Sequence, residues 1–281
     1  MVRLECAVPL AVALIICGAA ECPSAQTASH QRVGVAARES LEFTVGATLG
    51  ISASDDAGGA GMELDPSISL DALFMQRFGF SVEVPAVARL ALGRDALPGA
   101  TAAMGDPSIA ATYSLRVSDW RLGAELAYSH PLGIWDSRES AEKRITSGMG
   151  YPRLGATLTA LRYLDPLIAG MRLGAETWLS RQERFGTSTK PLILCLGFFA
   201  TEALNTAAAV SAGLTQKLAW PRRLDGKPGS AGPAWSLSGS ISIVLSEGDR
   251  SFRFGVSKLL SDFTAPIALD IGFFHSIKKR E

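Results

Sequence analysis

The chain has 281 residues, enough for one large β-domain or two ordinary ones. Its 27 Lys and Arg residues balance its 27 Asp and Glu residues, so no bulk charge points to nucleic acid or an acidic partner. The hydrophobic fraction of 47% is high for a soluble protein, yet after the N-terminus no apolar run approaches the roughly 18 residues of a transmembrane helix. Such dispersed apolarity suits a membrane barrel and is also compatible with a large soluble β-protein.

Residues 1–20 have the features of a secretory signal peptide. Arg3 supplies a modest positive start, residues 7–17 form an apolar segment, and residues 18–20 are small, as a cleavage site requires. Cleavage after Ala25 is an alternative, and a membrane anchor is disfavoured because the segment is short. Residues 21–39 are then expected to form a polar periplasmic lead-in.

Three of the four cysteines, Cys6, Cys17 and Cys22, lie in or beside the predicted signal peptide. Lipidation at Cys17 or Cys22 is a minor alternative, because the residue before a lipidated cysteine should be small and here it is Ile or Glu. Two distant cysteines, Cys22 and Cys195, would remain after cleavage. They form neither a disulfide framework nor a metal-binding pattern, so we expect no metal and no cofactor.

The stretch from 40 to 52 gives the first strand. One face carries Leu41, Phe43, Val45 and further apolar residues, while the alternate positions are Glu, Thr, Gly and Ser. Side chains on a strand alternate between its faces, so this strand has one apolar and one polar side. A soluble sandwich could show the same alternation once. Its repetition down the chain, at a length that crosses a bilayer on a tilted strand, favours a membrane barrel.

The same alternation predicts eleven further strands, and twelve is an even number, as bacterial barrels have. Their approximate ranges in chain order are 66–75, 80–85, 108–115, 120–129, 151–162, 170–179, 192–198, 209–218, 235–245, 252–257 and 269–276.

The predicted connections alternate between long and short. Long polar loops are expected at 53–65, 89–105, 132–147, 180–190 and 221–233, and the last connection on that side, 260–266, is shorter. Tight turns follow the even-numbered strands. Outer-membrane barrels have short periplasmic turns, longer outward loops and both termini inside, whereas a soluble sandwich has no reason to sort its loops by side.

The fold class is therefore predicted as all-β, an antiparallel up-and-down transmembrane β-barrel of about twelve strands spanning residues 40–277. The polar faces suit a hydrated lumen and the apolar faces suit lipid. Charged residues that share the polar faces are candidates to face the lumen: Glu42, Glu83, Arg121, Glu125, Arg172, Glu176, Arg253 and Asp270. Candidates to face lipid are Phe43, Leu122, Leu194, Leu237, Ile241, Phe254 and Ile271.

Aromatic residues recur near the predicted strand ends and could form the girdles that mark the membrane interfaces. The alternative is that they are ordinary packed aromatics. They are Trp120, Tyr128, Tyr151, Trp178, Trp220 and Trp235.

An enzyme is not favoured, although some outer-membrane barrels are lipid hydrolases. The histidines His30, His130 and His275 lie in no local arrangement with Ser and Asn, and the sequence has no phosphate-binding glycine loop. We therefore predict no catalytic residues.

The middle of the chain resembles a known family. Residues 80–85 (Phe-Ser-Val-Glu-Val-Pro) end one strand, Gly105-Asp106 opens the next, which ends in Tyr-Ser-Leu at 113–115, and His-Pro-Leu-Gly follows at 130–133. This order resembles the outer-membrane transporter-like barrels grouped as the "MetA-pathway of phenol degradation" family. The likeness covers roughly residues 67–133 and extends over the remainder by pattern alone; the fatty-acid-transporter class shares parts of it.

The sequence thus predicts an outer-membrane channel or transporter of a diderm bacterium, for passive passage of small molecules, with apolar ones among the candidates. The alternatives are a surface scaffold or adhesin barrel that presents its loops, and a β-sandwich lipoprotein. Expected partners are outer-membrane lipid, the barrel-assembly machinery and an unidentified small-molecule cargo, with no nucleic acid.

Overall fold

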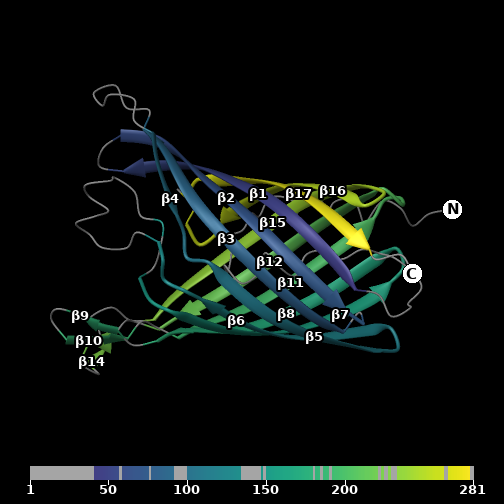
Figure 1. Ribbon diagram of the computed structural model, residues 1–281, viewed down its shortest axis with the longest axis horizontal. Coiled ribbons are helices and arrows are strands. Elements are labelled where there is room, and N and C mark those ends of the chain that lie inside the picture. Colours follow the sequence, from purple (N-terminus) through teal and green to yellow (C-terminus); the bar gives the residue numbers. More distant parts are fainter. Residues whose placement is uncertain are drawn as a thin grey trace.

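The chain forms a closed antiparallel β-barrel, seen from the side in the computed structural model of Figure 1. The structure describes residues 41–56, 59–75, 77–91, 100–133, 147, 150–179, 181–183, 186–189, 192–220, 223–224, 227–228, 233–262 and 265–278. The predicted signal peptide and lead-in lie outside these residues. None of the described residues forms a helix long and apolar enough to cross a membrane.

Twelve positions around the wall are occupied by strands, because β4 and β5 both pair with β3 and together fill one position. The barrel strands are β1 (Glu42–Asp56), β2 (Gly59–Phe74), β3 (Phe78–Ala91), β4 (Ala100–Met104), β5 (Ser108–Val117), β6 (Trp120–Ser129), β7 (Arg153–Leu164), β8 (Leu167–Trp178), β11 (Ile193–Ala203), β12 (Ala208–Ala219), β15 (Ala234–Glu247), β16 (Arg250–Leu259) and β17 (Ile267–Lys278). Each pairs with its neighbour in the chain, and β1 pairs with β17 to close the ring. The predicted twelve-stranded barrel is confirmed, and the β-sandwich alternative is wrong.

The two ends of the barrel differ. Connections between β2 and β3, β5 and β6, β7 and β8, β11 and β12, and β15 and β16 are short, and all lie at the end where β1 begins and β17 ends. At the opposite end the connections from β6 to β7, from β8 to β11 and from β12 to β15 are longer, as the strand bounds show. Figure 1 shows the barrel from the side, with β1 and β17 next to each other. We call the two ends the short-turn end and the loop end. This sorting of connections is the one that the sequence predicts.

The predicted loop at 53–65 is wrong. β1 continues to Asp56 and β2 begins at Gly59, with Ser52 opposite Glu63 and Ser54 opposite Gly61. Glycine and aspartate are poor strand formers, but cross-strand pairing in a sheet overrides such weak preferences. The predicted loop at 89–105 is shorter for the same reason, because β3 and β4 pair up to Leu90 and Ala100.

Two other predicted loops contain strands. β9 (Arg181–Glu183) and β10 (Gly186–Thr189) lie in the first, β13 (Arg223–Leu224) and β14 (Lys227–Pro228) in the second. The four form a small sheet of their own in the order β14-β13-β10-β9, which lies beyond the loop end in Figure 1. The alternation of polar and apolar residues could not predict it, since strands of two to four residues are too short to show a period.

The burial pattern is the reverse of that in a soluble protein. Large apolar side chains are exposed on the outer wall, for example Ile68 at 65%, Leu126 at 68% and Leu158 at 59%. Most of the buried side chains are instead polar, among them Ser81, Thr157 and Ser242. An apolar surface wrapped around a polar interior is what a barrel in lipid requires, because lipid solvates the outside and water solvates the inside.

Candidate functional site: the inner face of the barrel

Hydroxyl groups cover much of the inner face and bond to each other between neighbouring strands. Thr48 Oγ1 and Ser67 Oγ lie 2.7 Å apart, and Thr201 Oγ1 and Ser211 Oγ lie 2.8 Å apart. The fully buried Ser238 donates its hydroxyl to the backbone oxygen of Thr215 at 3.1 Å. Side chains directly opposite each other in antiparallel strands point to the same side, so the alternation in sequence becomes a continuous polar lining.

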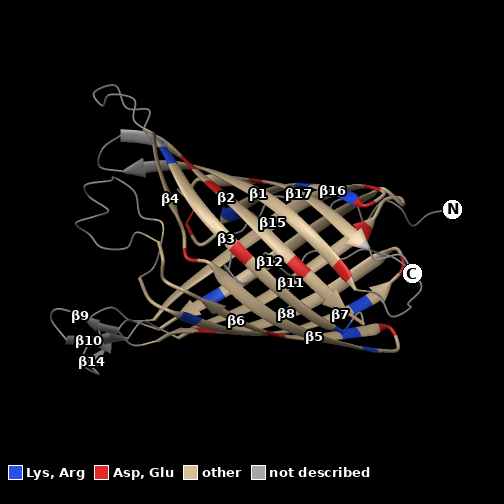
Figure 2. Ribbon diagram, viewed as in Figure 1, with Lys and Arg blue, Asp and Glu red and all other residues tan. Residues whose placement is uncertain are grey.

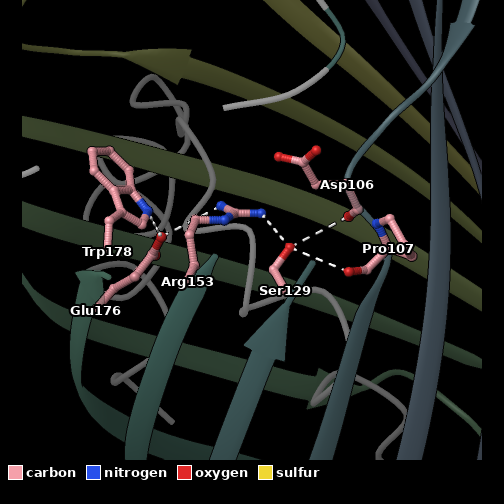
Figure 3. A network of polar contacts seen from close by, with 6 residues as sticks. All are labelled: Asp106, Pro107, Ser129, Arg153, Glu176 and Trp178. Atoms are coloured by element: carbon pink, nitrogen blue, oxygen red, sulfur yellow. Dashed lines mark hydrogen bonds and ion pairs between the residues drawn. The ribbon is translucent and has the colours of Figure 1, made fainter. Parts of the chain in front are cut away.

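A charged network lies where β6, β7 and β8 reach the loop end (Figure 3). Arg153 Nη1 donates to Glu176 Oε1 at 3.4 Å, and Arg153 Nη2 donates to Ser129 Oγ at 3.0 Å. The indole of Trp178 donates to the same Glu176 oxygen at 3.1 Å. Glu176 is buried, so these donors replace water around its carboxylate. The network therefore connects three adjacent strands at one mouth of the barrel.

An irregularity in the wall extends this network. Between β4 and β5 the residues 105–107 add one residue relative to β3, which bends the strand as a β-bulge does. Gly105 donates its backbone N–H to Pro85 O at 2.8 Å, and Asp106 Oδ1 accepts from Gly133 N at 2.8 Å. Ser129 Oγ lies 3.4 Å from the backbone oxygens of both Asp106 and Pro107. The bulge thus supports the serine that receives Arg153.

A second group of charges lies farther inside. The carboxylates of Asp71 on β2, Glu83 on β3 and Glu125 on β6 interact, since both glutamates act electrostatically on Asp71. Arg153 acts on Glu83 and Arg172 acts on Glu125. Asp71 Oδ2 has no hydrogen-bond partner among the described residues. The pairs Glu83–Arg153 (β3 and β7) and Asp71–Glu125 (β2 and β6) join strands that are not neighbours, so these two interactions cross the inner space.

Two aromatic rings cover glycines on the inner face. A Cβ built at Gly46 would lie 2.6 Å from the Phe274 ring, and one built at Gly272 would lie 2.7 Å from it. The Phe199 ring covers Gly170 in the same manner, and Arg172 Cζ lies 5.9 Å from the centre of that ring. Glycine is needed at these positions because any side chain there would displace a ring.

The structure places every predicted lumen residue on the inward side of its strand. Glu83, Glu125 and Glu176 are buried. Arg121 Nη2 donates to Ser114 Oγ at 3.1 Å, and Arg253 Nε lies 3.3 Å from Asp270 Oδ2. Glu42 faces inward at the start of β1, opposite Leu73. Arg121, Glu176 and Arg253 have partners on neighbouring strands, and Glu176 also accepts from Trp178 on its own strand.

The predicted lipid-facing residues lie on the outward side. Phe43, Leu122, Phe254 and Ile271 are exposed, whereas Leu194, Leu237 and Ile241 are half-exposed.

The sequence missed three residues of the inner face. Arg153 opens β7 and completes the mouth network, and because its partners lie on other strands the sequence around it carries no signal of this contact. Asp71 lies on the predicted polar face of β2, and its parity is the sequence signal for the inner face. Trp178 shares the inward parity of Glu176 and Arg172, which is a sequence signal for the inner face. Its place near a strand end instead favours an interfacial aromatic, as it does for the buried Tyr151. For these two the girdle prediction is wrong, while Trp120, Trp220 and Trp235 are exposed.

The histidines within the described residues form no catalytic arrangement. His130 Nδ1 lies 3.0 Å from the Tyr128 hydroxyl in an exposed position, and His275 lies near the end of β17. Among the described residues no group of three His, Cys, Asp or Glu side chains could hold a metal ion.

Comparisons with known proteins support the fold alone. No family model and no curated protein matches the chain. Among solved structures, the COG4313 outer membrane channel from Pseudomonas putida F1 aligns over 89% of this chain and 98% of its own, with a TM-score of 0.66 and 12% identity. The NanC porin aligns over 82% of this chain and 98% of its own, with a TM-score of 0.54 and 10% identity. The chain therefore has the fold of the bacterial outer-membrane β-barrels.

Proposed function

We propose that the chain is a passive channel of the bacterial outer membrane for small polar solutes. The observation that carries this proposal is the inversion of polarity in the closed barrel: exposed Ile68 and Leu126 outside, buried Ser81, Thr157 and Glu125 inside. A barrel built only as a membrane anchor has no need of hydroxyls and paired charges along its whole interior. The fold shared with a solved outer-membrane channel supports the same function, and so does the resemblance of residues 67–133 to the MetA-pathway family.

The inner face favours polar over apolar cargo. Passing an apolar molecule between Glu83, Arg153 and Arg172 would strip water from charged groups without giving them new partners, which is unfavourable. A hydroxylated or charged solute replaces that water with hydrogen bonds. Long side chains reaching into a barrel of this size also narrow it, so we expect a restricted path and small solutes.

Reversing one inward charge tests the proposal. Arg172→Glu or Arg121→Glu is expected to raise the permeability of cations relative to anions, because each adds negative charge beside the path. The measurement is the reversal potential in a planar bilayer under a salt gradient, with heat-modifiable gel migration to show that the variant is folded. Arg162→Glu is the matched control: Arg162 is exposed on the outward side of β7, 5.6 Å from the Trp120 ring, and should leave selectivity unchanged.

The outcomes distinguish charges that line the path from charges that only stabilise the folded barrel. Folded variants without any change in selectivity would mean that Arg121 and Arg172 do not line the path. Loss of folding on reversal would instead favour a purely structural network of cross-lumen ion pairs.

One observation favours a second function, the scaffold for surface partners. The sheet formed by β9, β10, β13 and β14 orders two loops beyond the barrel, which simple connections do not require. Deleting 181–189 should leave conductance intact if this sheet only presents a surface. A deletion that changes conductance would assign the sheet to the channel mouth.

A further inference from the structure

Three carboxylates on the first three strands follow one another along the barrel. Glu42 of β1 lies opposite Leu73, two residues from Asp71 on β2; Asp71 lies opposite Ser81, two residues from Glu83 on β3. Such diagonal neighbours are roughly 7–8 Å apart. Figure 2 shows red segments of β1, β2 and β3 following one another along the barrel. We call Glu42, Asp71 and Glu83 the acidic row; it runs from the short-turn end toward the loop end.

Three cations form a similar series on other strands. Arg121 lies at the start of β6, Arg172 in the middle of β8, and Lys217 near the loop end of β12. One strand separates each member from the next, β7 between the first two and β11 between the last two, with each step two residues closer to the loop end. We call Arg121, Arg172 and Lys217 the basic row.

The two rows border the same inner space. Glu125 interacts electrostatically both with Asp71 of the acidic row and with Arg172 of the basic row. Arg153, on β7 beside the basic row, acts on Glu83 of the acidic row. Arg153 and Glu83 are therefore opposite charges that approach each other from separate arcs of the wall.

The other inward charges named here divide evenly, four adding to this separation and four opposing it, so the two rows themselves set its direction. Glu63 and Asp65 on β2 and Asp270 on β17 add negative charge to the arc of the acidic row, with Asp65 and Asp270 on either side of Gly50. Arg89 on β3 and Arg253, paired with Asp270, oppose it. In the other arc Arg153 adds positive charge, and Glu125 and Glu176 oppose it. A field thus points across the lumen, from the basic to the acidic arc.

We propose that this field selects dipolar solutes, small zwitterions that carry an ammonium and a carboxylate group. The inference rests on the proposed channel function and names its substrate class. A zwitterion can turn its ammonium toward Asp71 and its carboxylate toward Arg172, so both ends replace lost water with charge-assisted hydrogen bonds. A solute with one net charge is attracted by one arc and repelled by the other, and a neutral solute gains neither contact.

Liposome swelling with two isomers tests this preference. Alanine and lactamide have the same composition, but only alanine is a zwitterion. Vesicles containing the purified barrel are expected to swell about threefold faster in alanine than in lactamide, the factor typical of weak, partly hydrated charge pairs. Equal rates in the two isomers would overturn the proposal while leaving the channel itself standing. Absence of swelling in both would overturn the channel function and the preference with it.

A double variant assigns the preference to the two rows. Asp71→Asn with Arg172→Gln removes one charge from each row and leaves the net charge unchanged, so the ratio of alanine to lactamide rates should fall to about one, as expected when the two charge pairs are lost. Asp119→Asn with Arg162→Gln makes the same exchange at exposed positions, a turn residue and an outward residue of β7, and should keep the ratio of the unmodified chain. If the folded Asp71→Asn, Arg172→Gln variant keeps the threefold ratio, the two rows do not cause the preference for alanine.

Discussion

Replacing Ile241 with lysine is expected to reduce the free energy of unfolding in a bilayer by about 2–4 kcal/mol. Ile241 lies near the middle of β15 and on its outward side, where its neighbours across the strands are Ala212 and Val256. An ammonium group at that depth must leave water or distort the bilayer, and no acidic partner lies opposite it on either neighbouring strand. Equilibrium urea unfolding in phospholipid vesicles, followed by tryptophan fluorescence, measures the loss.

The adjacent residue is the matched control. Ser240 lies on the inward, polar side of β15, opposite Gly213 and Ser257. Ser240→Lys should therefore be nearly neutral. Equal costs at 240 and 241 would show that the assigned outward and inward sides of β15 do not correspond to lipid and lumen.

Replacing Arg153 with glutamine is expected to reduce the free energy of unfolding by about 2–3 kcal/mol, measured in the same urea assay. Glu176 would keep the Trp178 indole but lose its cation, and removing one member of a fully buried pair costs about 3–5 kcal/mol. The loss should be smaller here because the pair lies near the mouth, where water can enter the network.

Two further variants decide whether this loss comes from the unpaired carboxylate. Arg153→Gln together with Glu176→Gln should recover most of the stability, because the remaining amides are neutral. Arg162→Gln, which removes an exposed arginine from the same strand, should cost less than about 1 kcal/mol. If the double variant is as unstable as the single one, the pair does not account for the effect.

The fold was predictable from the sequence because alternation is a local signal that each barrel strand repeats. Phe252, Phe254 and Val256 alternate with Arg253 and Gly255, and the structure places the two sets on opposite sides of β16. The lengths of the connections predicted at which end of the barrel each connection lies. The lengths of the strands were harder to predict from the sequence. Asp55 pairs with Ala60 only because the two strands lie side by side, and the glycine and aspartate residues of this stretch do not favour a strand.

The sequence predicts which side chains face the lumen, but not which of them contact each other. The parity of Glu125 and Arg172 places both inside, yet their interaction depends on the positions of β6 and β8 around the barrel. The same holds for Glu176, whose partner Arg153 lies 23 residues away on β7. The bulge at 105–107, which shifts parity between β4 and β5, likewise depends on pairing with β3.

Single-channel recording of the purified barrel in a planar bilayer tests the central claim most directly. The sample should first migrate differently on a gel before and after boiling, which shows that the closed barrel is intact. The account predicts discrete conductance steps whose ion selectivity shifts toward cations in Arg172→Glu. Folded, membrane-inserted barrels that carry no current, with or without residues 181–189, would contradict it.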